Sequence, residues 1–220
     1  MPSNDSANSP VKGIYALIDT TYVSPADIMT TADKLISGGA GIIQLRAKGM
    51  SAKHMLEAAC GLRDACASGN ATLIINDRVD IALACGAGGV HLGQDDLPVA
   101  EARKLLGGRA VIGLSTHNPA EAAQASLLGA DYVSFGPVFA TKTKKDAQSP
   151  KGIEGLREAR ACTTLPIVAI GGITEETLPA VLEAGADAAA IVSDILLARD
   201  ITAKAASLIS LAARCAEKRR

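Results

Sequence analysis

Short apolar runs alternate with amphipathic segments along almost the whole chain. Four of these runs follow the same beginning, a Gly, then Ala, then Gly or Asp, and they start at Gly39, Gly86, Gly129 and Gly185. Four further runs lie between them, at residues 13–19, 72–77, 110–115 and 166–171. Short continuous apolar runs bounded by turn residues are typical of strands that are buried on both faces. The pattern therefore predicts eight strands.

The segments between the runs have helical patterns. Asn, Ser or Thr stands before several of them and Gly closes most, as helix start and stop signals require. The predicted helices cover residues 24–39, 51–69, 78–86, 97–108, 118–129, 153–162 and 174–185, with a long final helix from about Ile195. Eight alternating strand–helix units predict an α/β protein, a single-domain (β/α)8 TIM barrel. The domain would cover residues 12–220, after a flexible N-terminal tail over residues 1–11.

An open doubly wound sheet is the alternative fold. It would place a Gly-rich GxGxxG turn after the first strand, and residues 17–25 read LIDTTYVSP instead. The length agrees with one domain, because a chain of 220 residues that is 48% hydrophobic can bury a full core. The barrel is thus the favoured fold.

Charge and composition narrow the class of partner. The 22 Lys and Arg residues nearly balance the 23 Asp and Glu residues, so no overall field attracts nucleic acid or an anionic membrane. No apolar run approaches the ~20 residues that a membrane span needs. The first ten residues, MPSNDSANSP, lack the apolar stretch of a signal peptide, and the five cysteines form no CxxC pair. We therefore expect a cytoplasmic protein with reduced thiols.

Polar residues or glycines follow the predicted strands. In a TIM barrel the carboxyl ends of all strands meet at one rim, where active sites lie. The rim groups are Asp19, Gln44, Arg46, Lys48, Asn76, Asp77, Gln94, Asp95, Asp96, Ser115, His117, Gly171, Gly172, Val192 and Ser193. This gathering predicts a site more strongly than any single residue does.

Gln44, Arg46 and Lys48 are spaced by two residues, so the period of a strand places their side chains on one face. If that face points inward, an amide and two cations converge at the barrel mouth, where they suit a polyphosphate. The alternative is an edge of solvated charges.

Asp77 and Asp96 follow adjacent strands. Two carboxylates so placed repel each other unless a cation lies between them, and Mg²⁺ typically takes one or two carboxylates together with water and phosphate oxygens. The alternatives are that Asp77 caps the helix that follows it, and that Asp95 or Asp96 caps the next one. A capping role for one acid leaves the other free to bind metal.

The last two strands and the longest loop indicate a second anion site. Two consecutive glycines, Gly171 and Gly172, would expose backbone N–H groups after the seventh strand, and phosphate sites after strands 7 and 8 recur in barrels. A structural tight turn is the alternative. The loop 136–152 carries several lysines and could close over substrate, or it is simply solvated.

The three histidines differ in their expected roles. His54 and His91 are interpreted as structural, and His117 is a weak acid–base candidate.

Five ordered motifs over residues 12–198 resemble the thiamine-phosphate synthase (thiamine-phosphate pyrophosphorylase) family. They are GIIQLRAK, LIINDRVDIALACGAGGVHLGQDD, GLSTH, FGPVFATKTKKD, and PIVAIGGIT with IVSDIL. The resemblance implies a Mg²⁺-dependent transferase in thiamine biosynthesis, with one Mg²⁺ per subunit. It would join 4-amino-2-methyl-5-hydroxymethylpyrimidine diphosphate to thiazole phosphate, or to its 2-carboxy form, and give thiamine monophosphate and pyrophosphate. Pyrophosphate would leave first, by a dissociative step.

The resemblance also implies a role for each matching residue. The pyrimidine diphosphate would be bound by Gln44, Leu45, Arg46, Ala47, Lys48, Asn76, Ser115 and Lys144. The thiazole phosphate would be bound by Thr141, Lys142, Thr143, Gly172, Val192 and Ser193. Asp77 and Asp96 would bind the metal, and the catalytic residues would be Arg46, Lys48 and Lys144, which stabilise the departing pyrophosphate.

Two rival functions remain at the level of sequence. One is the sister family that isomerises thiazole phosphate on the same barrel, which generally lacks the full set of diphosphate and metal residues. The other is a catalytically silent phosphate-binding or regulatory barrel, which an intact rim fits poorly. The expected partners are two phosphorylated small molecules, without nucleic acid or membrane, and a homodimer is left open.

Overall fold

A closed barrel of eight parallel strands forms the centre of the protein, in the order β1 to β8 around the ring. The computed structural model describes residues 11–141, 143 and 148–219. The strands are β1 (Gly13–Asp19), β2 (Ile42–Arg46), β3 (Thr72–Asn76), β4 (Gly89–Leu92), β5 (Val111–Thr116), β6 (Tyr132–Phe135), β7 (Ile167–Ile170) and β8 (Ala188–Ile191). The predicted TIM barrel is confirmed, and the open doubly wound sheet is wrong.

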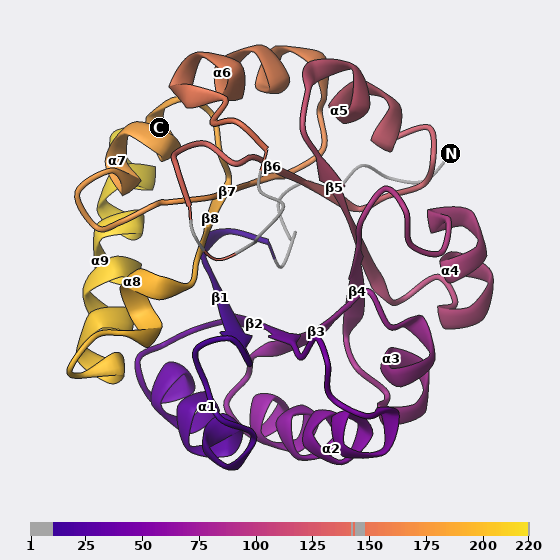
Figure 1. The fold of residues 1–220 in the computed structure, drawn as a ribbon. Helices are drawn as coiled ribbons and strands as arrows, with labels where there is room; N and C mark the ends of the chain where they lie inside the picture. Colours follow the sequence, from indigo (N-terminus) through magenta and orange to yellow (C-terminus); the bar gives the residue numbers. More distant parts are fainter. Residues whose placement is uncertain (1–10, 142, 144–147, 220) are drawn as a thin grey trace.

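Helices surround the strands as an outer ring (Figure 1). They are η2 (Pro25–Asp27), α1 (Ile28–Ser37), α2 (Ala52–Ser68), α3 (Val79–Cys85), α4 (Val99–Leu106), α5 (Pro119–Ala125), α6 (Gly152–Cys162), α7 (Leu178–Glu183), α8 (Ser193–Leu196) and α9 (Ile201–Lys218). Among the residues described, no helix is both long and apolar enough to cross a membrane.

The C-terminal segment differs from the prediction. In place of one long helix from about Ile195, the short helix α8 ends at Leu196 and α9 begins at Ile201. Asp200 stands between them in an extended conformation, and its side chain accepts a hydrogen bond from the backbone N–H of Ala203 at 3.0 Å. An aspartate in this position starts a new helix, because its carboxylate satisfies a backbone donor that has no partner within the helix.

Two apolar layers hold the barrel together. The outer layer lies between strands and helices, and the inner one fills the barrel with residues such as Tyr15, Ile42, Ile74, Tyr132 and Val168. Alternate residues of each strand enter alternate layers because the side-chain period of a strand is two. This two-residue period therefore determines which side chains of each strand point into the barrel, toward the site.

The N-terminal end of the described chain belongs to the inner layer. Val11, which the sequence prediction assigned to the tail, is only 1% exposed and packs there. Residues 1–10 of the predicted tail lie outside the described residues. The packed part of the domain therefore starts at least one residue before the predicted boundary.

Candidate active site

A cavity of about 390 Å³ opens at the carboxyl ends of the strands, on the rim where the sequence placed its polar residues. Residues from the ends of β1 to β8, or from the loops that follow them, line its wall. A smaller cavity of about 30 Å³ involves Tyr15, Gln44, His91 and Tyr132 and so reaches into the barrel interior. The predicted gathering of rim groups is therefore present.

The side chains of Gln44 and Arg46 on the inner face of β2, and of Lys48 just after the strand, lie at three depths. Gln44 is deepest and donates from Nε2 to the Tyr15 hydroxyl at 2.8 Å. Arg46 lies above it, 8% exposed, and Lys48 lies at the rim with an exposed side chain. The alternative of a solvated edge is thus wrong for Gln44 and Arg46.

Arg46 is an anion-binding group that is already partly neutralised. Its Nη1 lies 2.7 Å from Oδ2 of the buried Asp19, which follows from the pairing of Asp19 with Arg46 between β1 and β2. Its Nε is buried and has no hydrogen-bond partner among the residues that the structure describes. A buried donor without a partner costs free energy, so this atom favours an oxygen ligand in the cavity.

Leu45 and Ala47 lie on the opposite face of the same segment. Both side chains are buried in the outer apolar layer, between strands and helices. If these two residues contact the pyrimidine diphosphate, their backbone atoms make the contact.

Asp77 and Asp96 lie together at the ends of β3 and β4, on the cavity wall. Burial raises the pKa of Asp77, and the hydrogen bond and negative charge of the neighbouring Asp96 raise it further, while Lys48 partly opposes the shift. Lys48 Nζ is 3.5 Å from Asp77 Oδ2. Asp96 accepts the backbone N–H of Gly93 at 2.6 Å through Oδ2. Two close carboxylates of this kind are stabilised by a cation.

The capping alternatives for these acids are wrong. Helix α3 begins after Arg78 and α4 after Pro98, and neither start has a side-chain cap within the described chain. Asp95 is exposed, whereas Asp96 is half-buried. In the described part of the chain, no group of three or more His, Cys, Asp or Glu residues could hold a metal. The two neighbouring carboxylates of Asp77 and Asp96 fit an ion such as Mg²⁺, which completes its shell with water and phosphate oxygens.

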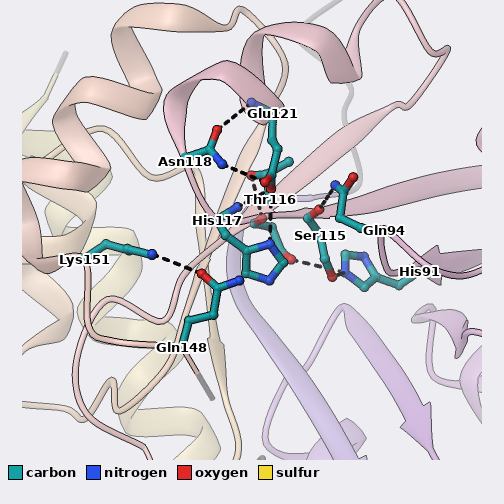
Figure 2. Close-up of polar contacts among 10 residues, drawn as sticks. His91, Gln94, Ser115, Thr116, His117, Asn118, Glu121, Gln148 and Lys151 are labelled. Carbon is teal, nitrogen blue, oxygen red and sulfur yellow. Dashed lines mark hydrogen bonds and ion pairs between the residues drawn. The ribbon is translucent and has the colours of Figure 1, made fainter. Parts of the chain in front are cut away.

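Ser115 at the end of β5 connects the rim to the interior of the barrel. Figure 2 shows its backbone oxygen accepting from Gln94 Nε2, at 2.6 Å, and its hydroxyl beside His91 Nε2, at 3.0 Å. Asn76, on the inner side of the same wall, also lines the cavity. Both residues are where the sequence predicted them.

His117 lines the cavity and is held by Glu121. The Glu121 carboxylate accepts from the His117 backbone N–H at 2.8 Å and lies 3.1 Å from Nδ1 (Figure 2). This pairing fixes the orientation of the ring and leaves its role as acid or base a prediction.

A buried chain of hydrogen bonds forms the floor of the site, and sequence reasoning missed it. The hydroxyls of Tyr15 and Tyr132 are 2.8 Å apart, and Tyr132 contacts His91 Nδ1 at 2.9 Å. His91 Nε2 then meets the hydroxyls of Ser115 and Ser134, at 3.0 and 3.1 Å. Burial is the largest factor raising the pKa of both tyrosines, so both hydroxyls keep their protons.

At the ends of β7 and β8, the cavity wall is formed by glycine backbone and small uncharged side chains. Gly171 and Gly172 have φ of +103° and +61°, and a Cβ would lie 2.5 Å from Pro137 Cβ and 2.4 Å from the Ala140 oxygen, respectively. The tight turn is therefore required by packing. The same glycines also line the cavity, together with Val192 and Ser193.

The loop after β6 contacts the segment that follows β1 at the mouth of the cavity. Thr141 and Thr143 line the wall, and the Thr143 hydroxyl is 3.0 Å from the hydroxyl of Tyr22, which follows β1. The predicted ligands Lys142 and Lys144 lie outside the described residues. Lys151 contacts Gln148 at 3.1 Å. No local sequence pattern indicates the Tyr22 contact, because it joins residues 121 positions apart.

Comparisons with known proteins agree on one family. A family described as "Thiamine monophosphate synthase" matches residues 14–195. The thiamine-phosphate synthase of Chloroflexus aurantiacus is 45% identical over 205 residues, which is 93% of this chain and 94% of that protein. The thiamine-phosphate synthase of Moorella thermoacetica is 42% identical over 205 residues, 93% of this chain and 98% of the relative.

A solved structure adds the same result. The thiamine phosphate pyrophosphorylase from Pyrococcus furiosus superposes with a TM-score of 0.85 at 32% identity, covering 94% of this chain and 97% of that one. A 3-hexulose-6-phosphate synthase, 19% identical with a TM-score of 0.68 over 90% of this chain and 99% of the other, shows the barrel alone.

Proposed function

The chain belongs to the thiamine-phosphate synthase family and forms thiamine monophosphate, and from this premise we propose how its residues divide the work. The pyrimidine diphosphate binds on the β2–β4 side of the cavity, and the thiazole phosphate binds on the β7–β8 side. The observation that carries the proposal is the convergence of Arg46, Lys48, Asp77 and Asp96 on one wall of a single cavity, opposite a wall of backbone.

On the first side, Arg46 and Lys48 stabilise the negative charge of the departing pyrophosphate. Arg46 offers its unpartnered Nε, and Lys48 has an exposed ammonium at the rim. Lys144, outside the described residues, is the third cation of the proposal. Asp77 and Asp96 would hold one Mg²⁺, which when bound adds positive charge beside the phosphate oxygens. Gln44, Asn76 and Ser115 orient the pyrimidine below.

The chemistry needs no strong general base. Loss of pyrophosphate from the pyrimidine methylene leaves a stabilised cation, which the thiazole nitrogen then attacks. The work of the protein is electrostatic stabilisation of the leaving group and exclusion of water from the cation. The buried floor of Tyr15, His91 and Tyr132 supports both tasks, because its hydrogen-bonding groups are already paired with one another.

On the second side, Gly172, Val192 and Ser193 bind the thiazole phosphate, with Thr141 and Thr143 from the β6–α6 loop. Lys142, outside the described residues, belongs to the same set. Backbone N–H groups at a glycine turn suit a phosphate, since no side chain keeps the anion away.

One assay tests the assignment against its rivals. Both substrates are mixed with the protein, with and without Mg²⁺, using thiazole phosphate and its 2-carboxy form in parallel. We expect thiamine monophosphate and pyrophosphate only when both substrates and Mg²⁺ are present, with CO2 released in addition when the 2-carboxy form is used. Absence of a Mg²⁺-dependent product from folded protein would refute the transferase. Conversion of the 2-carboxy form to an isomer without pyrimidine would favour the sister family.

Two further proposals concern the setting of the protein. We propose a cytoplasmic enzyme that does not bind nucleic acid, since its charges balance, and a homodimer in solution. Light scattering measures the mass, and a monomer at micromolar concentration would refute the dimer.

A further inference from the structure

Lys204 of α9 lies between two carboxylates behind the β7–β8 wall. Its Nζ is 2.9 Å from Glu175 Oε2 and 2.9 Å from Asp194 Oδ2. Glu175 belongs to the loop between β7 and α7, and Asp194 is in the first turn of α8, directly after β8. One ammonium group thus joins the segments that follow two adjacent strands.

Further hydrogen bonds tie the same two loops together. The backbone N–H of Glu175 donates to Asp194 Oδ2 at 3.1 Å, and Ser207 of α9 donates to Glu175 Oε1 at 2.5 Å. The side chain of Lys204 is 20% exposed and that of Asp194 is 23% exposed. The Glu175 side chain is more open, at 38%. The cluster is therefore partly shielded from water, and its charges interact somewhat more strongly than those of a fully open surface pair.

The position of the cluster relates it to the proposed phosphate site. Glu175 stands three residues after Gly172, and Asp194 follows Ser193 directly. Gly172 and Ser193 line the cavity, whereas Lys204, Glu175 and Asp194 are absent from its wall. Figure 1 shows α8 and α9 side by side on the outside of the barrel next to β8. Any effect of Lys204 on substrate must therefore act through the two loops.

The charges explain why the ammonium matters. Hydrogen bonds from Ser207 and then from Lys204 lower the pKa of Glu175, so this carboxyl is ionised at neutral pH. Burial opposes the charge of Lys204, but hydrogen bonds to Glu175 and Asp194 outweigh that effect, and the pKa of Lys204 is raised. Without the cation, two carboxylates that share it would face each other and repel.

We propose that Lys204 is a positioning residue for the thiazole-phosphate half of the reaction. Its ammonium holds the β7–α7 loop and the start of α8 at the separation at which Gly172 and Ser193 bind the same phosphate. This inference rests on the proposed function, because it takes that wall as the thiazole-phosphate site.

The test is the variant Lys204→Met, which keeps an unbranched side chain, one heavy atom shorter than lysine, and removes its charge. With both substrates and Mg²⁺, we expect the KM for thiazole phosphate to rise about fivefold, as the loss of a partly exposed charge pair allows. The KM for the pyrimidine diphosphate should stay within about twofold of the unmodified value. Equal changes in both KM values, or no change in either, would overturn the proposal.

Matched variants separate charge from structure. Lys204→Arg keeps the charge and should restore most of the affinity for thiazole phosphate. Lys204→Met combined with Glu175→Gln removes the repulsion and should recover part of it, as a double-mutant cycle measures. Lys218→Met, an exposed lysine on the same helix, should leave both KM values unchanged. If Lys204→Met does not fold, Glu175→Gln alone should raise only the KM for thiazole phosphate, and no selective rise would contradict the inference.

Hydrogen exchange makes the inference independent of turnover. In Lys204→Met the amides of residues 171–175 and 192–196 should exchange faster than in the unmodified chain, while β2 and β3 stay unchanged. If the unmodified chain makes no thiamine monophosphate, the proposed function fails, and this exchange pattern still decides whether Lys204 holds the loops. Unchanged exchange in both loops would refute the positioning role.

Discussion

The two proposed anion sites at the cavity mouth are built from different groups. The β2–β4 side uses charged side chains, Arg46, Lys48, Asp77 and Asp96, on the wall itself. The β7–β8 side uses glycine backbone and small side chains on the wall, and its charged residues stand behind the wall, at Lys204, Glu175 and Asp194.

Under the proposed division of the site, the difference matches the two phosphorylated substrates. Charges on the wall attract a diphosphate strongly, but they must be balanced within the protein, as in the pairs Asp19–Arg46 and Asp77–Lys48. Charges behind the wall only set the shape of a backbone nest, which suits a single phosphate that remains attached throughout the reaction. Removing charge should therefore harm the first side, and adding bulk should harm the second.

The largest expected effect comes from the acids that we propose bind the metal. Asp96→Ala should lower kcat/KM about a thousandfold, since a bound metal supplies several kcal/mol of charge stabilisation. Asp95→Ala, at the exposed neighbour, should stay within about twofold. Steady-state kinetics over a Mg²⁺ titration provides the measurement, and excess Mg²⁺ should restore part of the activity of Asp96→Ala. Equal losses in the two variants would contradict the choice of Asp96.

A second, smaller effect is expected at Arg46. Arg46→Met should lower kcat/KM about a hundredfold, from the loss of roughly 3 kcal/mol of charged hydrogen bonding to the leaving group. It should also destabilise the fold by about 3–5 kcal/mol, because Asp19 is fully buried and would lose its partner.

The double variant Asp19→Asn with Arg46→Met distinguishes the two effects. Denaturant unfolding should show most of the lost stability restored, while activity stays low. Recovery of activity along with stability would mean that Arg46 only supports the fold.

The smallest effect tests bulk on the second side. Gly172→Ala should raise the KM for thiazole phosphate about tenfold, since its Cβ would lie 2.4 Å from the Ala140 oxygen and displace the turn. Gly129→Ala is the control, because Gly129 also has a positive φ, +87°, but its Cβ would meet nothing within 4 Å.

Both variants should lose about 1 kcal/mol of stability through backbone strain, and Gly172→Ala should lose more because its Cβ also clashes with the Ala140 oxygen. A KM effect in Gly129→Ala of the same size, or an increase in Gly172→Ala that falls on the pyrimidine diphosphate instead, would contradict the division of the site.

The sequence predicted features that depend on local periodicity and strand order. Spacing by two placed Gln44, Arg46 and Lys48 on one face, and the adjacency of two strands brought Asp77 beside Asp96. A strand's period and the order of strands in a barrel are nearly independent of the other side chains.

The pattern of hydrophobic and polar residues could not predict contacts across the closed barrel. Tyr15 and Tyr132 are 117 residues apart and meet only once the ring is closed and its register fixed. The pair Asp19–Arg46 left a usable signal, opposite charges at the ends of neighbouring strands, that the prediction did not use. Lys204 left none, because its helix begins only after the break at Asp200.

The tyrosines also give the protein an optical property. The chain contains no tryptophan and three tyrosines. Two of them, Tyr15 and Tyr132, form the buried hydrogen-bonded floor, and the third, Tyr22, touches Thr143 at the lip. The tyrosine emission of the folded enzyme thus originates around the substrate cavity, so intrinsic tyrosine fluorescence should report the filling of the site without any attached label.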